Sequence, residues 1–306
     1  MERKLEIGFR NIHPKFGWYE VVGKVDSQNF VVRFDNTKYE YTCSKYHILD
    51  NCVCDRKNSF FHQVGEKYEH PIFGEYTIVK ILGNKRATIE FANTKHRYDT
   101  SIRNIIHKNV KDVFAPTVYG VGCIGEHKGK NISKNLAYRT WKNMLKRCYD
   151  VDFLNSRPTY KNCYVCKEWL CFLNFKVWFE KNYIEGWCLD KDILIKGNKE
   201  YAPDKCCFVP NEINVLFTKR QNYRGNTPIG VNYYPAQRRF KECYKAFLTN
   251  GNNKTYLGCF DTQDEAFNTY KVAKEEWIKV VADKWKDRLE PKVYKALCDY
   301  QVEITD

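Results

Sequence analysis

Two cysteines in the middle of the sequence have a spacing that could hold a metal ion. Cys163 and Cys166 are separated by two residues, which is the spacing that one half of a structural zinc site uses. No second pair with this spacing follows, although three later cysteines could complete a site: Cys188, Cys206 and Cys207. The other cysteines are scattered through the chain, as small apolar core residues are in a reducing compartment. We therefore favour buried thiols over zinc.

A second segment combines acidic, basic and amide side chains between Leu189 and Asn214. It begins Leu-Asp-Lys-Asp-Ile and continues from Tyr201 as Tyr-Ala-Pro-Asp-Lys-Cys-Cys-Phe-Val-Pro-Asn-Glu-Ile-Asn. It resembles the HNH, or His-Me finger, nuclease motif, particularly as phage proteins carry it. In that family a strand ends in Asp-His, a loop leads to a second strand, and a helix follows that bears Asn. The resemblance covers about residues 135–224.

The resemblance implies a role for individual residues. Asp190 and Asn214 match the pair that holds one divalent cation, Mg²⁺ or another, where it stabilises charge on the scissile phosphate. Lys191 stands where the family has the histidine that deprotonates the attacking water. Lys205 stands where a structural asparagine often precedes the second strand. The resemblance therefore assigns Asp190 and Lys191 to catalysis, and Asp190 and Asn214 to the metal.

The missing histidine separates two hypotheses about this segment. All seven histidines lie at or before position 127. A lysine acts as a base only if its pKa falls several units below about 10.4, and the flanking Asp190 and Asp192 would raise it. His127 or Tyr201 could supply the proton acceptor instead. Without any acceptor, the finger would be an inactive scaffold that binds DNA.

Positive charge is concentrated in the middle third of the chain. The whole chain has a formal net charge of +14, and residues 128–224 contribute +9, from 19 basic and 10 acidic side chains. A compact basic segment attracts a polyanion, because displaced phosphate counterions favour binding. Apolar residues between Leu136 and Tyr149 recur at helical spacing. The rest of that predicted helix carries side chains that we expect to contact phosphates: Arg139, Lys142, Lys146 and Arg147.

The C-terminal part has the pattern of a small sheet followed by a helix. Asn250-Gly251 is a hairpin signal, and Thr262 is placed to cap a helix. From Gly230-Val231 through Tyr256–Phe260 to Tyr270, the segment resembles the DNA-binding domain of plant ethylene-response factors, which also occurs appended to phage HNH nucleases. In that family three strands enter the major groove. The resemblance implies five contact residues: Arg238, Arg239, Lys241, Lys245 and Lys254.

The N-terminal third contains an internal repeat. His-Pro-Lys-Phe-Gly at His13 returns as His-Pro-Ile-Phe-Gly at His70, and Asn-Thr-Lys at Asn36 returns at Asn93, both with an offset of 57 residues. Short β-rich runs predict two small units, each a curled sheet or a Tudor-like barrel. Such units recognise a peptide, a nucleic-acid backbone or another protein. An architectural role, including oligomerisation through the repeats, is an equal alternative.

These segments predict an α+β, multidomain protein. Its parts are β-rich repeat units at residues 1–65 and 66–127, an HNH-like ββα finger module flanked by helices at 128–224, and a three-stranded-sheet DNA-binding domain with a terminal helix at 225–306. No stretch approaches the roughly 18 apolar residues of a membrane span, and the N-terminus lacks an apolar signal core. We therefore expect a cytoplasmic, nucleoid-associated protein in a bacterial host, without a membrane partner.

The expected function is that of a phage-type HNH-like endonuclease that binds double-stranded DNA and hydrolyses phosphodiesters with a divalent metal. The alternative is a catalytically inactive, nuclease-derived binder. Such a binder would act as a DNA-associated regulator or inhibit a host defence protein complex.

Overall fold

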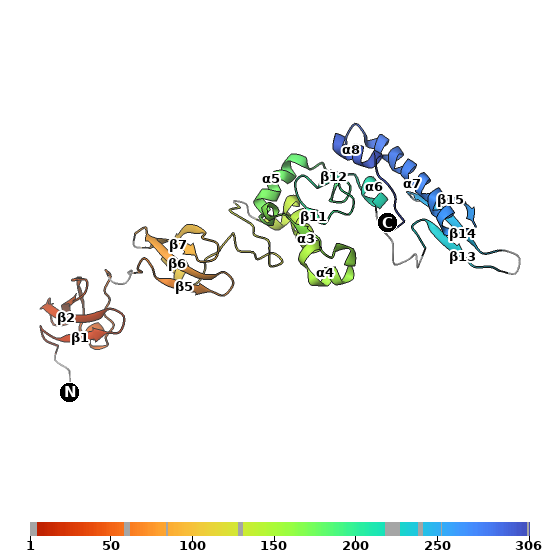
Figure 1. The fold of residues 1–306 in the computed structure, drawn as a ribbon. Helices are drawn as coiled ribbons and strands as arrows, with labels where there is room; N and C mark the ends of the chain where they lie inside the picture. Colours follow the sequence, from red (N-terminus) through yellow and green to blue (C-terminus); the bar gives the residue numbers. More distant parts are fainter. Residues whose placement is uncertain are drawn as a thin grey trace. The chain divides into compact units, whose positions relative to one another are not determined.

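The computed structural model describes residues 5–57, 62–83, 85–127, 131–217, 227–237, 241–251, 253–304 and 306. The chain forms two compact units, Met1–Ala115 and Pro116–Asp306. Helices and small, mainly antiparallel sheets are both present (Figure 1), so the chain is α+β and multidomain, as the sequence predicts. Within the described residues, no helix has the length and apolar character needed to cross a bilayer.

Each sequence repeat forms a four-stranded antiparallel sheet followed by a short helix. The first repeat contains β1 (Arg10–His13), β2 (Gly17–Lys24), β3 (Asn29–Phe34), β4 (Glu40–Ser44) and α1 (Lys45–Leu49). The second contains β5 (Lys67–His70), β6 (Gly74–Ile81), β7 (Arg86–Phe91), β8 (Arg97–Ser101) and α2 (Ile102–Ile106). Every bound of the second set lies 57 residues after its counterpart. The sequence repeat is therefore also a structural repeat.

Each repeat has its own apolar core beneath its sheet. A fully buried tyrosine, Tyr19 in one and Tyr76 in the other, donates a hydrogen bond to the carbonyl of Ile48 or Ile105 at 3.2 and 2.8 Å. The strands follow one another in sequence order, and the first and last do not pair with each other in the described residues. The units are thus open curled sheets and not Tudor-like barrels.

The second unit begins with the helices and short strands that the sequence places in the finger module. They are η1 (Ile132–Lys134), α3 (Leu136–Tyr149), α4 (Val151–Ser156), η2 (Pro158–Tyr160), β9 (Tyr164–Val165), η3 (Lys167–Leu170), α5 (Phe172–Asn182), β10 (Cys188–Asp190), β11 (Glu200–Tyr201), β12 (Cys207–Val209), α6 (Asn211–Asn214) and η4 (Val215–Phe217). The helix at Leu136–Tyr149 has the bounds that the sequence predicts, because the Asn135 side chain caps its first turn.

The C-terminal part of this unit is a three-stranded antiparallel sheet with two helices. Its elements are β13 (Val231–Tyr234), β14 (Cys243–Asn250), β15 (Asn253–Phe260), α7 (Gln263–Trp285) and α8 (Pro291–Cys298). Thr262 and Glu265 form a capping box at the start of α7, which confirms the predicted cap. The predicted hairpin also forms, since Asn250 pairs with Asn253.

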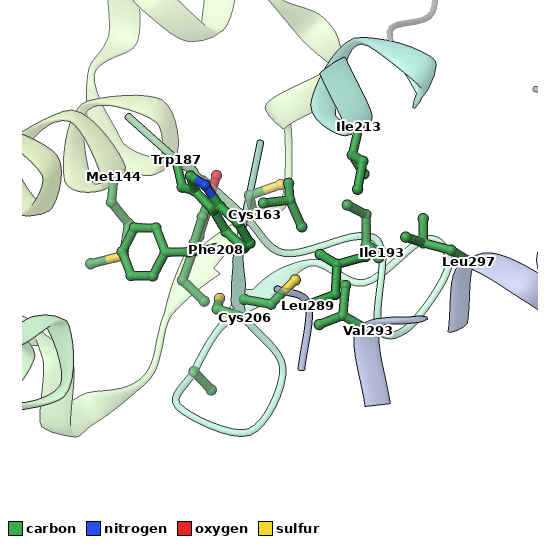
Figure 2. Close-up of a cluster of buried hydrophobic side chains, with 14 of the residues drawn as sticks. Met144, Cys163, Trp187, Ile193, Cys206, Phe208, Ile213, Leu289, Val293 and Leu297 are labelled. Atoms are coloured by element: carbon green, nitrogen blue, oxygen red, sulfur yellow. The ribbon is translucent and has the colours of Figure 1, made fainter. Parts of the chain in front are cut away.

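One continuous apolar core runs through the finger module and the C-terminal part. Figure 2 shows Leu289, Val293 and Leu297, in and just before α8, beside Ile193 and Ile213 of the finger. The terminal helix therefore packs on α7 and also reaches the core of the finger module. The two segments that the sequence separates near residue 225 share this core and form one folded unit.

Candidate nucleic-acid interface and nuclease-like finger

The segment that resembles a nuclease motif forms a ββα arrangement. Strand β10 pairs antiparallel with β12, with Asp190 opposite Cys207, and helix α6 follows β12 directly. Helix α6 also contacts β10. Asp190 ends the first strand and Asn214 ends the helix. The two predicted metal ligands thus lie on neighbouring elements.

The Asp190 carboxylate accepts hydrogen bonds from the backbone of the loop that follows it. Its Oδ1 accepts hydrogen bonds from the backbone N–H groups of Asp192 and Ile193, at 2.7 and 2.8 Å. Burial raises the pKa of this carboxyl, against the opposing effect of those two hydrogen bonds. One oxygen of Asp190 therefore closes the turn after β10.

Lys191 is a structural cation. Its side chain is 6% exposed, and Nζ donates to both oxygens of Asp192 at 2.7 and 2.8 Å and to the Asn198 carbonyl at 2.6 Å. Burial alone would lower its pKa, but the hydrogen bond and charge of Asp192 outweigh burial and raise it. A general base needs the opposite shift. The observed contacts are those of a loop anchor, and the role of Lys191 as catalytic base stays a prediction.

The two alternative proton acceptors, Tyr201 and His127, are not placed as bases beside Asp190 either. The Tyr201 ring is 2% exposed, and burial raises the pKa of its hydroxyl well above the ordinary value despite the nearby Arg147. His127 lies at the start of the second unit, where its ring meets the edge of Phe172 at a centroid distance of 6.2 Å. Neither arrangement presents a neutral base beside Asp190.

The predicted metal ligands do not suit a divalent cation as they stand. The positive charges of Lys191 and Arg147 both act on Asp190, and Asn214, the second predicted ligand, is a neutral amide. In the described residues, no three His, Cys, Asp or Glu side chains gather in a group that could hold a metal ion. Burial raises the pKa of Cys166 to about 11 and that of Cys163 as well, which opposes the thiolate form that zinc requires. No chemical step through a metal follows from this arrangement.

Helix α3 presents a basic face. Arg139, Lys142 and Lys146 are exposed, and they follow one another at spacings of three and four residues, which puts them on one side of the helix. No carboxylate in the described part of the chain pairs with them. Arg147 differs from the prediction, because its guanidinium is half-buried against the rings of Tyr160 and Tyr201. Arg147 therefore packs within the fold, and its contact with phosphate stays a prediction.

The C-terminal sheet has one covered and one open face. Val231, Ala246 and Leu248 are buried on the face that packs on α7. Strand alternation and the observed register put another set on the opposite face. That set contains two lysines and no carboxylate among the described strand residues: Asn232, Tyr234, Cys243, Lys245, Phe247, Thr249, Lys254, Tyr256 and Cys259.

The two lysines of the open face lie against aromatic rings. Lys245 Nζ is 4.2 Å from the centroid of Tyr234, and Lys254 Nζ is 4.1 Å from that of Phe247. Such cation–π contacts hold the ammonium groups over the face. The sequence resemblance named both lysines, but it missed the aromatic partners Tyr234 and Phe247, although the alternation of side chains along β13 and β14 would have placed them on the same face. Lys241 is exposed just before β14, and Arg238 and Arg239 lie outside the described residues.

Comparison of the chain with protein-family profiles, curated proteins and solved structures gave no match.

Proposed function

We propose that this protein binds double-stranded DNA, and that the nuclease-like finger serves as a scaffold in it. The open face of the β13–β15 sheet carries the proposal. It offers two lysines, held over aromatic rings, with no carboxylate beside them among the described strand residues of the sheet. The sequence resemblance implies that such a three-stranded sheet enters the major groove. The basic face of α3 in the same folded unit adds phosphate contacts.

A scaffold role for the finger agrees with the state of its polar residues. Lys191 is protonated and tied to Asp192, while Asp190 closes a turn. Metal-dependent hydrolysis stays a prediction from the sequence resemblance. It requires that wild-type protein nicks supercoiled plasmid in Mg²⁺ or Mn²⁺, and that Asp190→Asn abolishes the nicking. We expect no nicking, and no change in melting temperature when either metal is added.

DNA binding is tested by titrating a labelled duplex at several salt concentrations. Each lost phosphate contact lowers the slope of log K against log salt by about one. The Lys245→Gln/Lys254→Gln variant should therefore reduce the slope by about two and weaken binding. The matched control, Lys279→Gln/Lys295→Gln, removes the same charge from exposed positions on α7 and α8. Equal losses in both variants, or no binding by the wild type, would contradict the proposal.

A further inference from the structure

The two N-terminal repeats have kept few exposed side chains in common. Most exposed positions differ: Ile12 matches Glu69, and Glu40 matches Arg97. The exposed side chains that agree lie in the turns between the first and second strands and between the third and fourth strands, at one end of each sheet. They are Pro14 with Pro71, Asn36 with Asn93, and Lys38 with Lys95. We call each set, with His13 or His70 of the same turn, the tip of its repeat.

The histidine of each tip is held in one tautomer. His13 Nδ1 accepts hydrogen bonds from the backbone N–H groups of Lys15 and Phe16 at 3.1 and 3.2 Å. His70 Nδ1 accepts the two equivalent bonds at the same distances. A neutral imidazole that accepts at Nδ1 carries its proton at Nε2. Burial and the charge of Lys15 lower the pKa of His13, which favours this neutral form. Each tip therefore has an Nε2–H group as a donor.

The asparagine of each tip packs against the histidine turn. A Cβ added to Gly17 would lie 2.9 Å from Asn36 Nδ2, and one added to Gly74 would lie 3.1 Å from Asn93 Nδ2. Neither amide has a hydrogen-bond partner among the described residues. The two repeats thus present the same unengaged amide in the same position.

The lysine of each tip occupies an unfavourable backbone conformation. Lys38 has φ 55° and Lys95 has φ 60°, in the left-handed region that glycine and asparagine tolerate best. Lysine is nevertheless present in both copies, and no carboxylate within the described ranges pairs with it. The backbone conformation does not favour lysine at this position in either copy.

The nearby carboxylates at this end of each sheet already have partners. In the first repeat Asp35 pairs with Arg10, and in the second Glu75 pairs with Lys67 at 3.0 Å. Two buried carboxylates, Asp55 and Asp112, accept hydrogen bonds from Thr37 and Thr94, the residues before the tip lysines. Arg10 and Lys67 occupy equivalent positions. Each tip thus combines an ammonium group, an amide and an imidazole N–H in a region without a free carboxylate, which is a set of donors that suits a phosphate group.

We infer that the two tips bind backbone phosphates of double-stranded DNA, one site in each repeat. This inference rests on the proposed DNA binding and adds the N-terminal unit to the contact surface. Two equal sites on one chain strengthen the binding of a polymeric ligand, because the second contact forms within the complex. Backbone contacts of this kind position a protein without reading sequence.

The test uses the full-length chain and the variant Lys38→Asn/Lys95→Asn. Asparagine suits the left-handed conformation, so the melting temperature should stay equal or rise. The salt slope for duplex binding should nevertheless fall by about two. The control Lys24→Gln/Lys80→Gln removes two exposed lysines near the opposite end of β2 and β6, and it should bind as the wild type does.

Three results would overturn the inference, and they are distinguishable. If the tip variant binds the duplex as the wild type does, the inference about the tips is wrong. The proposed DNA binding through the C-terminal sheet then still stands. An equal loss in the tip variant and its control shows that general charge, and not the tips, supplies the contact. If the wild-type protein binds no duplex, both the inference and the proposed function are wrong.

Discussion

The indole Nε1 of Trp285 donates a hydrogen bond of 2.8 Å to the Glu212 carboxylate and so joins the finger helix α6 to the long helix α7. Lys284 Nζ donates to both oxygens of the same carboxylate at 2.7 and 2.9 Å. Helix α7 also covers the inner face of the C-terminal sheet. The finger is therefore linked through α7 to the proposed DNA-binding face.

Glu212→Ala should lower the free energy of unfolding by about 1 kcal/mol, because it removes hydrogen bonds from Lys284 and Trp285 in a half-exposed place. Hydrogen bonds from Lys284 and then Trp285 hold the pKa of Glu212 below its ordinary value of 4.5. A lowered carboxyl pKa stabilises the fold above that ordinary value, and this contribution is lost as the pH falls through the folded-state pKa. Denaturant unfolding at pH 7 and pH 3 measures the difference. Glu276→Ala, at an exposed position on α7, the helix that bears Lys284 and Trp285, should have no effect at either pH.

Lys191→Met should destabilise the second unit by about 1 to 3 kcal/mol, because the Asn198 carbonyl and Asp192 lose their donor. If Lys191 were a base, the main effect would be on nicking, with stability retained. Thermal unfolding and the plasmid assay on one preparation separate these roles. Lys161→Met, at an exposed lysine of the same unit, is the control. A variant that melts as the wild type does would argue against the anchor.

Lys274→Met should stabilise the protein at neutral pH. Lys274 shares a pocket with Phe217, Ile229 and Tyr300, and burial lowers its pKa to about 8. Protonation of Lys274 is therefore less favourable in the folded than in the unfolded state. Below about pH 8 the side chain is charged in both states, and its buried charge then lowers the free energy of unfolding by the full amount. The gain, on the order of 2 kcal/mol, should shrink as the pH rises from 8 toward the ordinary value of 10.5. A constant gain across this pH range would show that packing alone explains it.

Gly122→Ala should destabilise the second unit by about 1 to 3 kcal/mol through overpacking. A Cβ at Gly122 would lie 2.4 Å from Leu145 and 2.9 Å from Trp141 of α3. Gly23→Ala in the first repeat is the matched comparison, since its Cβ would lie 3.4 Å from Val31. Melting temperatures of the two variants should differ clearly. Equal values would mean that the segment before α3 yields without strain.

Local signals predicted the elements of this protein better than its site. The 57-residue offset gave the repeated strands, and the Thr262 cap and the Asn250-Gly251 turn gave the C-terminal sheet and helix. In the finger module, by contrast, α5 begins only at Phe172 and follows the 3-10 turn η3, because Cys171 is extended and bridges to Cys123. That contact is distant in sequence and leaves no periodic signal.

The sequence predicted that Asp192 raises the pKa of Lys191, but it did not predict the contacts that Lys191 and Arg147 make with more distant residues. Both are basic residues whose partners are set by tertiary packing: Asn198 for one, and Tyr160 and Tyr201 for the other. From the sequence alone, a basic residue on a helix or beside a motif is equally compatible with exposure to solvent and with contact to a ligand. Only the fold distinguishes an exposed Lys142 from an inward Arg147.

The two repeats have the same length, so a strand of one repeat could pair in the sheet of the other during folding. Differences between the two cores oppose this misfolding. Strands of matching register in one chain can exchange places, a common misassembly of tandem repeats. Phe30 in β3 and Ala87 in β7 occupy equivalent positions, and both are buried. An exchange would force a ring into the space of a methyl group in one sheet and leave a cavity in the other. Divergence in the cores therefore directs each strand to its own sheet.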